Sequence, residues 1–390
     1  MRTQVAIVGG GPAGLLLSHL LHLHGIGSVV LERRSQEYVQ QRVRAGVLEQ
    51  GTVDLLRDVG LGERMLREGE VHRGVYLQFD DERQHIPFQE LTGRAITVYG
   101  QQEVVKDLNE RRRRDGGQVL FEVSNVAVHD VATDRPFVRF TFDGVDHELH
   151  ADFIAGCDGF HGVCRDAIPA GVRTIYERVY PFGWLGILAT VGPSSDELIY
   201  ANHASGFALH SMRSATLSRF YLQCAPDEPR DAWPDDRIWT ELRTRLGTPG
   251  WTLHEGPIID KVITAIRSFV AEPLRHGRLF LAGDSAHIVP PTGAKGLNLA
   301  VSDVDKLAEA IADFYRTGSA TGLDCYSAAC LQRVWRVQHF SWWMTSLTHH
   351  FGGPNAAFER RLQRSQFDYL RSSTAAATTL AENYVGLPTR

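Results

Sequence analysis

A glycine-rich turn near the N-terminus constrains the fold of this chain more than any other stretch. The turn occupies residues 9–14 (Gly-Gly-Gly-Pro-Ala-Gly), after an apolar run at Gln4–Val8 and before a leucine-rich segment at Leu15–Leu21. The apolar run predicts a buried strand, and the leucine-rich segment predicts a helix that ends at Gly25. A second predicted strand, Ser28–Leu31, completes a β-α-β unit.

The glycines of this turn have the G-x-G-x-x-G spacing that is typical of dinucleotide-binding sites. Gly9 permits the tight turn, Gly11 lets a pyrophosphate approach the backbone, and Gly14 lets helix and strand pack closely. The helix N-terminus then offers its partial positive charge to the phosphates. Glu32, at the end of the second strand, is placed to bind the hydroxyls of a ribose. The motif suits NAD and FAD equally, and a turn that only connects strand to helix is the alternative.

Composition excludes several classes of protein. The 41 basic and 46 acidic residues give a net charge of −5, so no global field attracts nucleic acid or a membrane surface. Five cysteines without C-x-x-C spacing argue against a disulfide framework or a metal site. The chain shows neither a signal peptide nor an apolar run of about 18 residues that could span a bilayer. We therefore expect a cytoplasmic protein without nucleic-acid or membrane partners and without a metal.

Two further stretches resemble motifs of the single-component flavoprotein aromatic hydroxylases. Residues 152–162 resemble the D-G motif of that family and include Asp158, and residues 278–287 resemble its G-D motif, whose aspartate is Asp284. No second G-x-G-x-x-G follows, which suits a family without a separate nicotinamide domain. Further matching stretches extend the resemblance over nearly the whole chain; they lie at 42–51, 180–186, 287–298 and 381–388.

The resemblance implies an α/β fold of interleaved parts. We expect a Rossmann-like FAD-binding domain at 1–173, with small β insertions near 71–98, that resumes at 269–316. An antiparallel-sheet substrate domain is expected at 174–268, and C-terminal helices at 317–390. By analogy, those helices would form the interface of a homodimer.

The activity that the resemblance implies is hydroxylation of 4-hydroxybenzoate at the 3-position to protocatechuate, with FAD, O2 and NAD(P)H. In this family a flavin C4a-hydroperoxide attacks the substrate phenolate, although a free phenol titrates only near pH 10. Tyr200 and Tyr384 match the family's two proton-relay tyrosines, and His72 matches the outer end of the relay. Pro291 matches the residue whose backbone carbonyl orients the attacked carbon. Without the resemblance, buried core tyrosines and a surface histidine would be the plainer interpretation.

The same resemblance implies how the substrate carboxylate is held. Arg213 matches a bidentate clamp, for which a planar guanidinium is suited. Ser211 and Tyr221 match hydroxyl donors beside it, and Tyr200 and Pro291 also contact the substrate. On sequence alone, an arginine on an alternating strand is more often solvated.

Residues for both nucleotides follow from the resemblance. Lys295 is expected to add positive potential beside the reduced flavin, and Arg219 to affect the flavin's position. Arg33, Arg34 and Tyr38 lie where relatives read a 2′-phosphate, which favours NADPH with NADH possible, and His161 and Arg267 match contacts to the pyrophosphate. The complete set of expected FAD contacts is Gly9, Gly11, Gly14, Glu32, Arg42, Arg44, Gln102, Asp158, Arg219, Asp284, Lys295, Leu297 and Asn298.

Three other functions stay open at this point. One is a related hydroxylase of 3-hydroxybenzoate, 4-aminobenzoate or protocatechuate. Another is a flavin-dependent halogenase, which would be expected to carry a W-x-W signature that this chain lacks. The third is a catalytically silent flavoprotein that serves as a binding module; it should have lost the relay and the clamp first.

Overall fold

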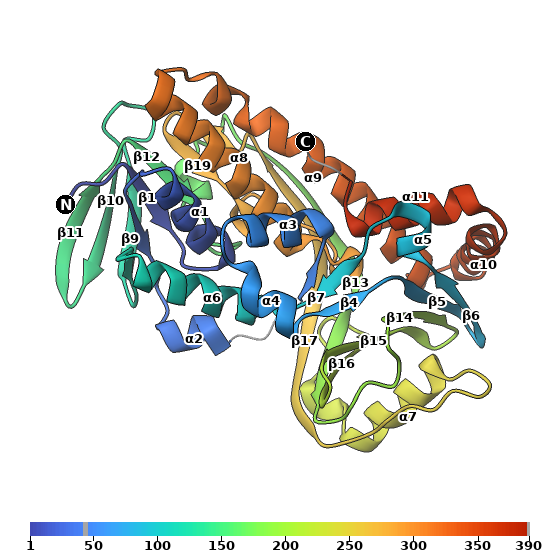
Figure 1. Cartoon of the computed structure of the whole chain (residues 1–390). Coiled ribbons are helices and arrows are strands. Elements are labelled where there is room, and N and C mark those ends of the chain that lie inside the picture. Colours follow the sequence, from blue (N-terminus) through green and yellow to red (C-terminus); the bar gives the residue numbers. More distant parts are fainter. Residues whose placement is uncertain (42–45, 388–390) are drawn as a thin grey trace.

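A six-stranded sheet forms one half of the molecule in the computed structural model, which describes residues 1–41 and 46–387 (Figure 1). The strand order is β18-β19-β12-β1-β2-β8, and every pair is parallel except β18–β19. Burial on both faces explains the uninterrupted apolar runs of the central strands. The strands are β1 (Val5–Val8), β2 (Ser28–Leu31), β8 (Gln118–Leu120), β12 (Phe153–Gly156), β18 (Arg275–His276) and β19 (Leu279–Leu281).

Helices cover this sheet. α1 (Pro12–Leu23) packs against both α6 (Gln101–Arg114) and α8 (Gly296–Thr317). All leucines of α1 except the last, Leu23, are buried, as expected for a helix enclosed on several sides. A three-stranded antiparallel sheet flanks this half; it consists of β9 (Ser124–His129), β10 (Phe137–Phe142) and β11 (Val145–His150).

An eight-stranded sheet forms the other half, in the order β20-β17-β13-β16-β15-β14-β5-β6. Two long strands, β13 (Thr174–Ala189) and β17 (Ile258–Glu272), pair along their length and join the two halves (Figure 1). All neighbours are antiparallel except β14 and β5. The other strands are β5 (Val75–Phe79), β6 (Glu82–Ile86), β14 (Ile199–His203), β15 (Gly206–Ser214), β16 (Leu217–Cys224) and β20 (His287–Ile288).

The remaining elements surround these two sheets. A small sheet has the order β3-β7-β4, and the C-terminal helices lie along the eight-stranded sheet (Figure 1). Within the described residues, no helix is long and apolar enough to cross a membrane. These elements are α2 (Gln36–Gln41), β3 (Val47–Leu48), α3 (Gln50–Asp58), α4 (Gly62–Glu68), β4 (Glu70–His72), α5 (Phe88–Thr92), β7 (Ile96–Val98), α7 (Asp235–Leu246), α9 (Thr321–Thr348), α10 (Ala356–Ser372) and α11 (Thr374–Val385).

The mixed α/β fold and the β-α-β opening are confirmed, with the first two strands and α1 close to their predicted bounds. Among the described helices, α2, α3, α4, α5 and α7 were not predicted, and α11 was expected only as one of the C-terminal helices. α7 carries buried apolar residues at helical spacing (Ile238, Leu242 and Leu246), which was the available signal. α11 is rich in alanine and threonine, so its apolar stripe is weak.

Candidate active site

The glycine turn between β1 and α1 has the geometry that its motif predicts. Gly9 adopts a φ of +108°, and a Cβ there would lie 2.2 Å from the carbonyl oxygen of Cys157. A Cβ on Gly14 would lie 2.0 Å from the carbonyl oxygen of Gly9, so α1 needs glycine to pack this closely. Around the Cβ position of Gly11, by contrast, the described chain has no atom within 4 Å. This open space at the N-terminus of α1 fits a pyrophosphate.

These contacts predict different effects of alanine at two glycines of the turn. Gly14→Ala should destabilise the apoprotein by about 1–3 kcal/mol, because the methyl group overpacks a backbone contact. Gly11→Ala should leave the melting temperature of the apoprotein unchanged and weaken FAD binding tenfold or more. Thermal melts of the apoproteins and FAD titration by fluorescence check both. Tight FAD binding by the Gly11 variant would contradict the placement of the pyrophosphate.

Glu32 directly follows β2, beside the glycine turn. Its Oε2 accepts a hydrogen bond from the backbone N–H of Gly10 at 2.7 Å, and its Oε1 accepts one from the N–H of Arg34 at 2.8 Å. These bonds fix the carboxylate, and each oxygen keeps a further acceptor site for a ribose hydroxyl.

Two buried oxygens near this end of the sheet have no hydrogen-bond partner among the described residues. They are Oδ1 of Asp158 and Oε1 of Gln102. The other carboxylate oxygen of Asp158 accepts from the N–H of Cys164 at 2.9 Å, and burial raises the pKa of Asp158. Because unpaired buried polar atoms are rare in native proteins, these oxygens indicate a polar ligand such as FAD.

Asp284 lies half-buried on the 3-10 turn Gly283–Ser285 that follows β19. The N–H of Gly283 donates to Oδ2 of Asp303 at 3.0 Å, and the same oxygen lies 2.6 Å from Nε2 of His287. Burial disfavours a charged His287, but the Asp303 carboxylate outweighs it and raises the pKa of His287. The buried contact between Asp303 and His287 therefore holds the turn that presents Asp284.

The start of α8 is tied to the segment that precedes α3. Asn298 accepts from the N–H of Glu49 at 2.9 Å, and its amide nitrogen donates to the carbonyl oxygens of Val47 and Ala294, both at 3.0 Å. Leu297 lies half-buried in the same first turn. Asn298 thus acts on the expected flavin site by joining two segments, with both amide hydrogens already in use.

We expected Lys295 to add positive potential beside the flavin, but in the structure its ammonium group is buried and paired. Its ammonium group is 1% exposed and donates to Oε1 of Glu49 and to the carbonyl oxygen of Tyr384, each at 2.7 Å. Arg333 on α9 binds the other oxygen of Glu49 at 2.7 Å. Burial opposes the ionisation of Glu49, but Lys295 and Arg333 lower its pKa. Burial lowers the pKa of Lys295, although Glu49 favours its charged form, so the positive potential here belongs to the cluster with Arg333 rather than to Lys295 alone.

Glu49 and Arg333 were missed as members of the site. Glu49 lies in a stretch that carried the family resemblance, which was a usable signal. Arg333 lies 284 residues away in a helix without a motif, so the sequence offered none.

Two buried tyrosines come together between the eight-stranded sheet and α11. The hydroxyl oxygens of Tyr200 on β14 and Tyr384 on α11 lie 2.5 Å apart, and both residues are 1% exposed. Burial raises the pKa of both hydroxyls, so both stay protonated at neutral pH. Such a pair can pass a proton from one oxygen to the other.

His72, which the resemblance places at the outer end of the relay, is buried in the structure. It ends β4 at 1% exposed, and burial lowers its pKa to about 4. Neither ring nitrogen has a hydrogen-bond partner among the described residues. The surrounding β3-β7-β4 sheet and the chain that covers it could not be inferred from His72 alone. Pro291, in contrast, is exposed and begins the 3-10 turn Pro291–Gly293 just before α8.

The register of the eight-stranded sheet places most expected substrate residues on one face. Tyr200 pairs with Leu209, which pairs with Tyr221, while Ser211 pairs with Arg219 on the next strand. Because directly paired residues and residues two apart share a face, all five side chains point to the same side.

Arg213 follows on the same strand as Ser211, at an irregularity in the ladder. Its Nη1 donates to the carbonyl oxygen of Met212 at 2.9 Å and lies 3.5 Å from Oγ of Ser211. Its buried Nε has no hydrogen-bond partner among the described residues, and burial lowers the pKa of Arg213. The hydroxyl of Ser211 donates to the carbonyl oxygen of Arg219 at 3.0 Å. The hydroxyl proton of Ser211 is therefore already in a hydrogen bond, whereas the guanidinium of Arg213 still has an N–H that can donate to an anion.

Arg219 is a second cation on this face. It is 5% exposed, and its Nε and Nη1 form no hydrogen bond within the described chain. Asp260 lies 3.6 Å from Nη1, and the guanidinium lies over the ring of Tyr221 at 5.3 Å. An under-satisfied buried guanidinium fits a place beside a flavin or an anionic substrate.

The residues expected to bind NAD(P)H form two groups. His161 and Arg267 both contact the ring of Phe160, at 5.0 Å between rings and 4.8 Å from the guanidinium carbon. Arg33, Arg34 and Tyr38 are exposed just after β2, with Arg34 over the ring of Tyr38 at 5.1 Å. Arg42 and Arg44, expected to contact FAD, lie outside the described residues.

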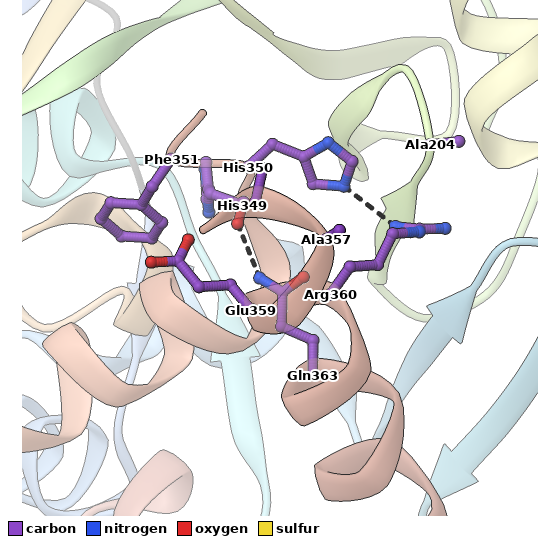
Figure 2. A pocket seen from close by; sticks show the side chains of 9 residues that line it. Ala204, His349, His350, Phe351, Ala357, Glu359, Arg360 and Gln363 are labelled. Atoms are coloured by element: carbon purple, nitrogen blue, oxygen red, sulfur yellow. Dashed lines mark hydrogen bonds between the residues drawn. The ribbon is translucent and has the colours of Figure 1, made fainter. Parts of the chain in front are cut away.

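A separate cavity of about 250 Å³ lies near the end of α9 and the start of α10 (Figure 2). Its Arg360 donates from one terminal nitrogen to Asn202 and His350 and from the other to both oxygens of Asp80. Because this guanidinium is already paired, we assign no ligand to the cavity.

Comparison with known proteins agrees with this geometry. Residues 2–341 match a family model described as FAD binding domain. The chain is 49% identical over 390 residues to p-hydroxybenzoate hydroxylase from Acinetobacter baylyi, covering 100% of this chain and 96% of the relative.

Solved structures share the fold. A p-nitrophenol 4-monooxygenase from Pseudomonas putida superimposes with a TM-score of 0.84 at 20% identity, covering 99% of both chains. A complex of aklavinone-11 hydroxylase with FAD and aklavinone gives a TM-score of 0.74 at 21% identity, covering 89% of this chain and 69% of that one.

Proposed function

This chain belongs to the FAD-dependent flavoprotein aromatic hydroxylases, and from that premise we propose that it converts 4-hydroxybenzoate to protocatechuate with O2 and NAD(P)H. The observation that carries the proposal is the buried contact between Tyr200 and Tyr384, on a sheet face that also holds Ser211 and Tyr221. The A. baylyi relative, whose name gives p-hydroxybenzoate as its substrate, supports the choice of ring.

In the proposed reaction, FAD, Arg213 and the tyrosine pair have separate chemical roles. Bound FAD supplies the redox chemistry with O2. Arg213 binds the substrate carboxylate, because its guanidinium lies next to the sheet face and has an unpaired Nε. Tyr200 accepts the phenolic proton as its own proton moves to Tyr384. The resulting phenolate carries more electron density on the ring carbon that is hydroxylated.

The assay for this proposal is oxidation of the nicotinamide by the FAD-loaded protein in the presence of different benzoates. We expect 4-hydroxybenzoate to increase the rate many-fold and protocatechuate to form. The same assay with 3-hydroxybenzoate and 4-aminobenzoate tests related substrates. A large increase with one of these and none with 4-hydroxybenzoate would overturn the substrate, and no increase with any benzoate would favour a silent flavoprotein.

For the donor, we propose NADPH. Arg33 and Arg34 are exposed after β2 and would face a 2′-phosphate. Replacing NADPH with NADH in the assay should raise the KM. A lower KM for NADH would contradict the preference.

We also propose a cytoplasmic homodimer. Large apolar side chains exposed on the C-terminal helices support an interface there; they are Trp335, Trp342, Phe358, Leu362 and Tyr369. Light scattering on the purified protein measures the mass.

A further inference from the structure

The burial of His72 leaves the proposed proton route without an outlet. A residue that is 1% exposed cannot exchange protons with bulk water directly. Its low pKa keeps the ring neutral at pH 7, so that one nitrogen can accept a proton while the other releases one. Another group must therefore connect His72 with solvent.

The loop before β14 brings two carboxylates to this place. Oε1 of Glu197 accepts a hydrogen bond at 2.9 Å from the backbone N–H of Arg73, the residue next to His72. The neighbouring Asp196 is the charged group that acts on His72 and favours its protonation. Glu197 is thus fixed beside the end of β4 by a bond to the backbone.

A histidine extends this contact toward solvent. Nε2 of His85 lies 2.6 Å from Oε2 of Glu197, and the side chains are 40% and 13% exposed, respectively. Exposure therefore increases stepwise from His72 through Glu197 to His85. A carboxylate in contact with an imidazole can pass a proton to it, and the more exposed imidazole can release that proton to water.

Gly74 leaves room for this pair. A Cβ there would lie 2.3 Å from Nε2 of His85 and 2.9 Å from Oε2 of Glu197. The same Cβ would lie 2.5 Å from the backbone carbonyl oxygen of Ile86, so β6 also requires glycine at this position. The absence of a side chain lets the pair rest against the backbone two residues after His72.

The other titratable groups around the pair are less suited to exchange with solvent. His210 is fully buried, and its Nε2 accepts from the N–H of Ser194 at 3.0 Å. Tyr76 packs on His85 with ring centroids 4.9 Å apart, and burial together with Asp196 and Glu197 raises its pKa. Arg83, which also acts on Tyr76, carries a permanent positive charge.

We propose that Glu197 and His85 form the solvent end of the proton route and that His72 is an internal member of it. On substrate binding the phenolic O–H bond breaks and its electron pair stays on the oxygen. The proton passes through Tyr200, Tyr384 and His72 to the pair, and leaves from His85 to water. Water molecules bridge the step at His72, whose nitrogens bond to no described residue. The inference rests on the proposed function, because it needs a phenol beside Tyr200.

The test is the rate of proton release when the FAD-loaded protein is mixed with 4-hydroxybenzoate in weak buffer that contains a pH indicator. We expect Glu197→Gln and His85→Ala to slow release tenfold or more while the equilibrium Kd of 4-hydroxybenzoate stays unchanged. Added imidazole should restore the rate in the His85 variant, which a structural defect would not allow. Glu90→Gln, at an exposed glutamate on nearby α5, should behave as the wild type.

The outcomes separate the two proposals. A wild-type protein that neither releases a proton nor forms protocatechuate overturns the proposed function and the outlet with it. Release by the wild type at a rate unchanged in both variants overturns the outlet alone. If Glu197→Gln does not fold, the His85→Ala variant tests the outlet alone. Slow proton release that imidazole restores supports the outlet, and release at the wild-type rate overturns it.

Discussion

Replacing Arg213 with alanine will weaken binding of 4-hydroxybenzoate by about 30-fold to several thousand-fold. The range corresponds to about 2–5 kcal/mol for truncating one partner of a buried, hydrogen-bonded charge pair. The reason is local. Arg213 has a buried, unpaired Nε beside the sheet face that holds Tyr200 and Tyr221, so a bound carboxylate would lose its partner. Titration of the oxidised protein, followed by flavin absorbance, measures the Kd.

A ligand without the charge supplies the control for this variant. 4-Hydroxybenzamide has the same ring and hydroxyl but no carboxylate, so the wild type and Arg213→Ala should bind it with similar affinity. Equal losses for the acid and the amide would mean that Arg213 holds the fold of β15 rather than the carboxylate.

Replacing Tyr200 with phenylalanine will lower the rate of hydroxylation about a hundredfold or more, the usual contribution of a positioned proton-transfer group. Substrate binding should be nearly intact, because the clamp at Arg213 is untouched. The variant removes the hydroxyl that lies 2.5 Å from that of Tyr384, so phenolate formation loses its first acceptor. Single-turnover kinetics, with the absorbance of bound phenolate as a second readout, separate binding from hydroxylation.

Tyr76→Phe is the matched control, since this tyrosine on the neighbouring strand β5 is outside the relay. It should hydroxylate at the wild-type rate. Full activity of the Tyr200 variant would remove the tyrosine pair from the mechanism.

The sequence predicted the parts of this protein that depend on local chemistry. The spacing of Gly9 and Gly14 predicted close backbone contacts, and the structure has both contacts. Tyr200 and Tyr384 lie 184 residues apart in the sequence, and no local pattern links them. Only the family resemblance could therefore predict that they act together.

The partners of buried charges could not be predicted. Lys295 was expected to add positive potential beside the flavin, and tertiary packing pairs it with Glu49, whose other oxygen binds Arg333. His72 suggested an exposed relay end, but neighbouring strands bury it. In each case the environment comes from segments far away in sequence, and it decides the charge that the group carries.

The central claim is that this chain inserts an oxygen atom from O2 into 4-hydroxybenzoate. The most direct measurement is mass spectrometry of the product formed by the FAD-loaded protein with NADPH under isotopically labelled O2. We expect protocatechuate that carries one labelled oxygen atom in stoichiometric ratio to the NADPH consumed. Oxidation of NADPH that yields only hydrogen peroxide, or protocatechuate without label, would contradict the account.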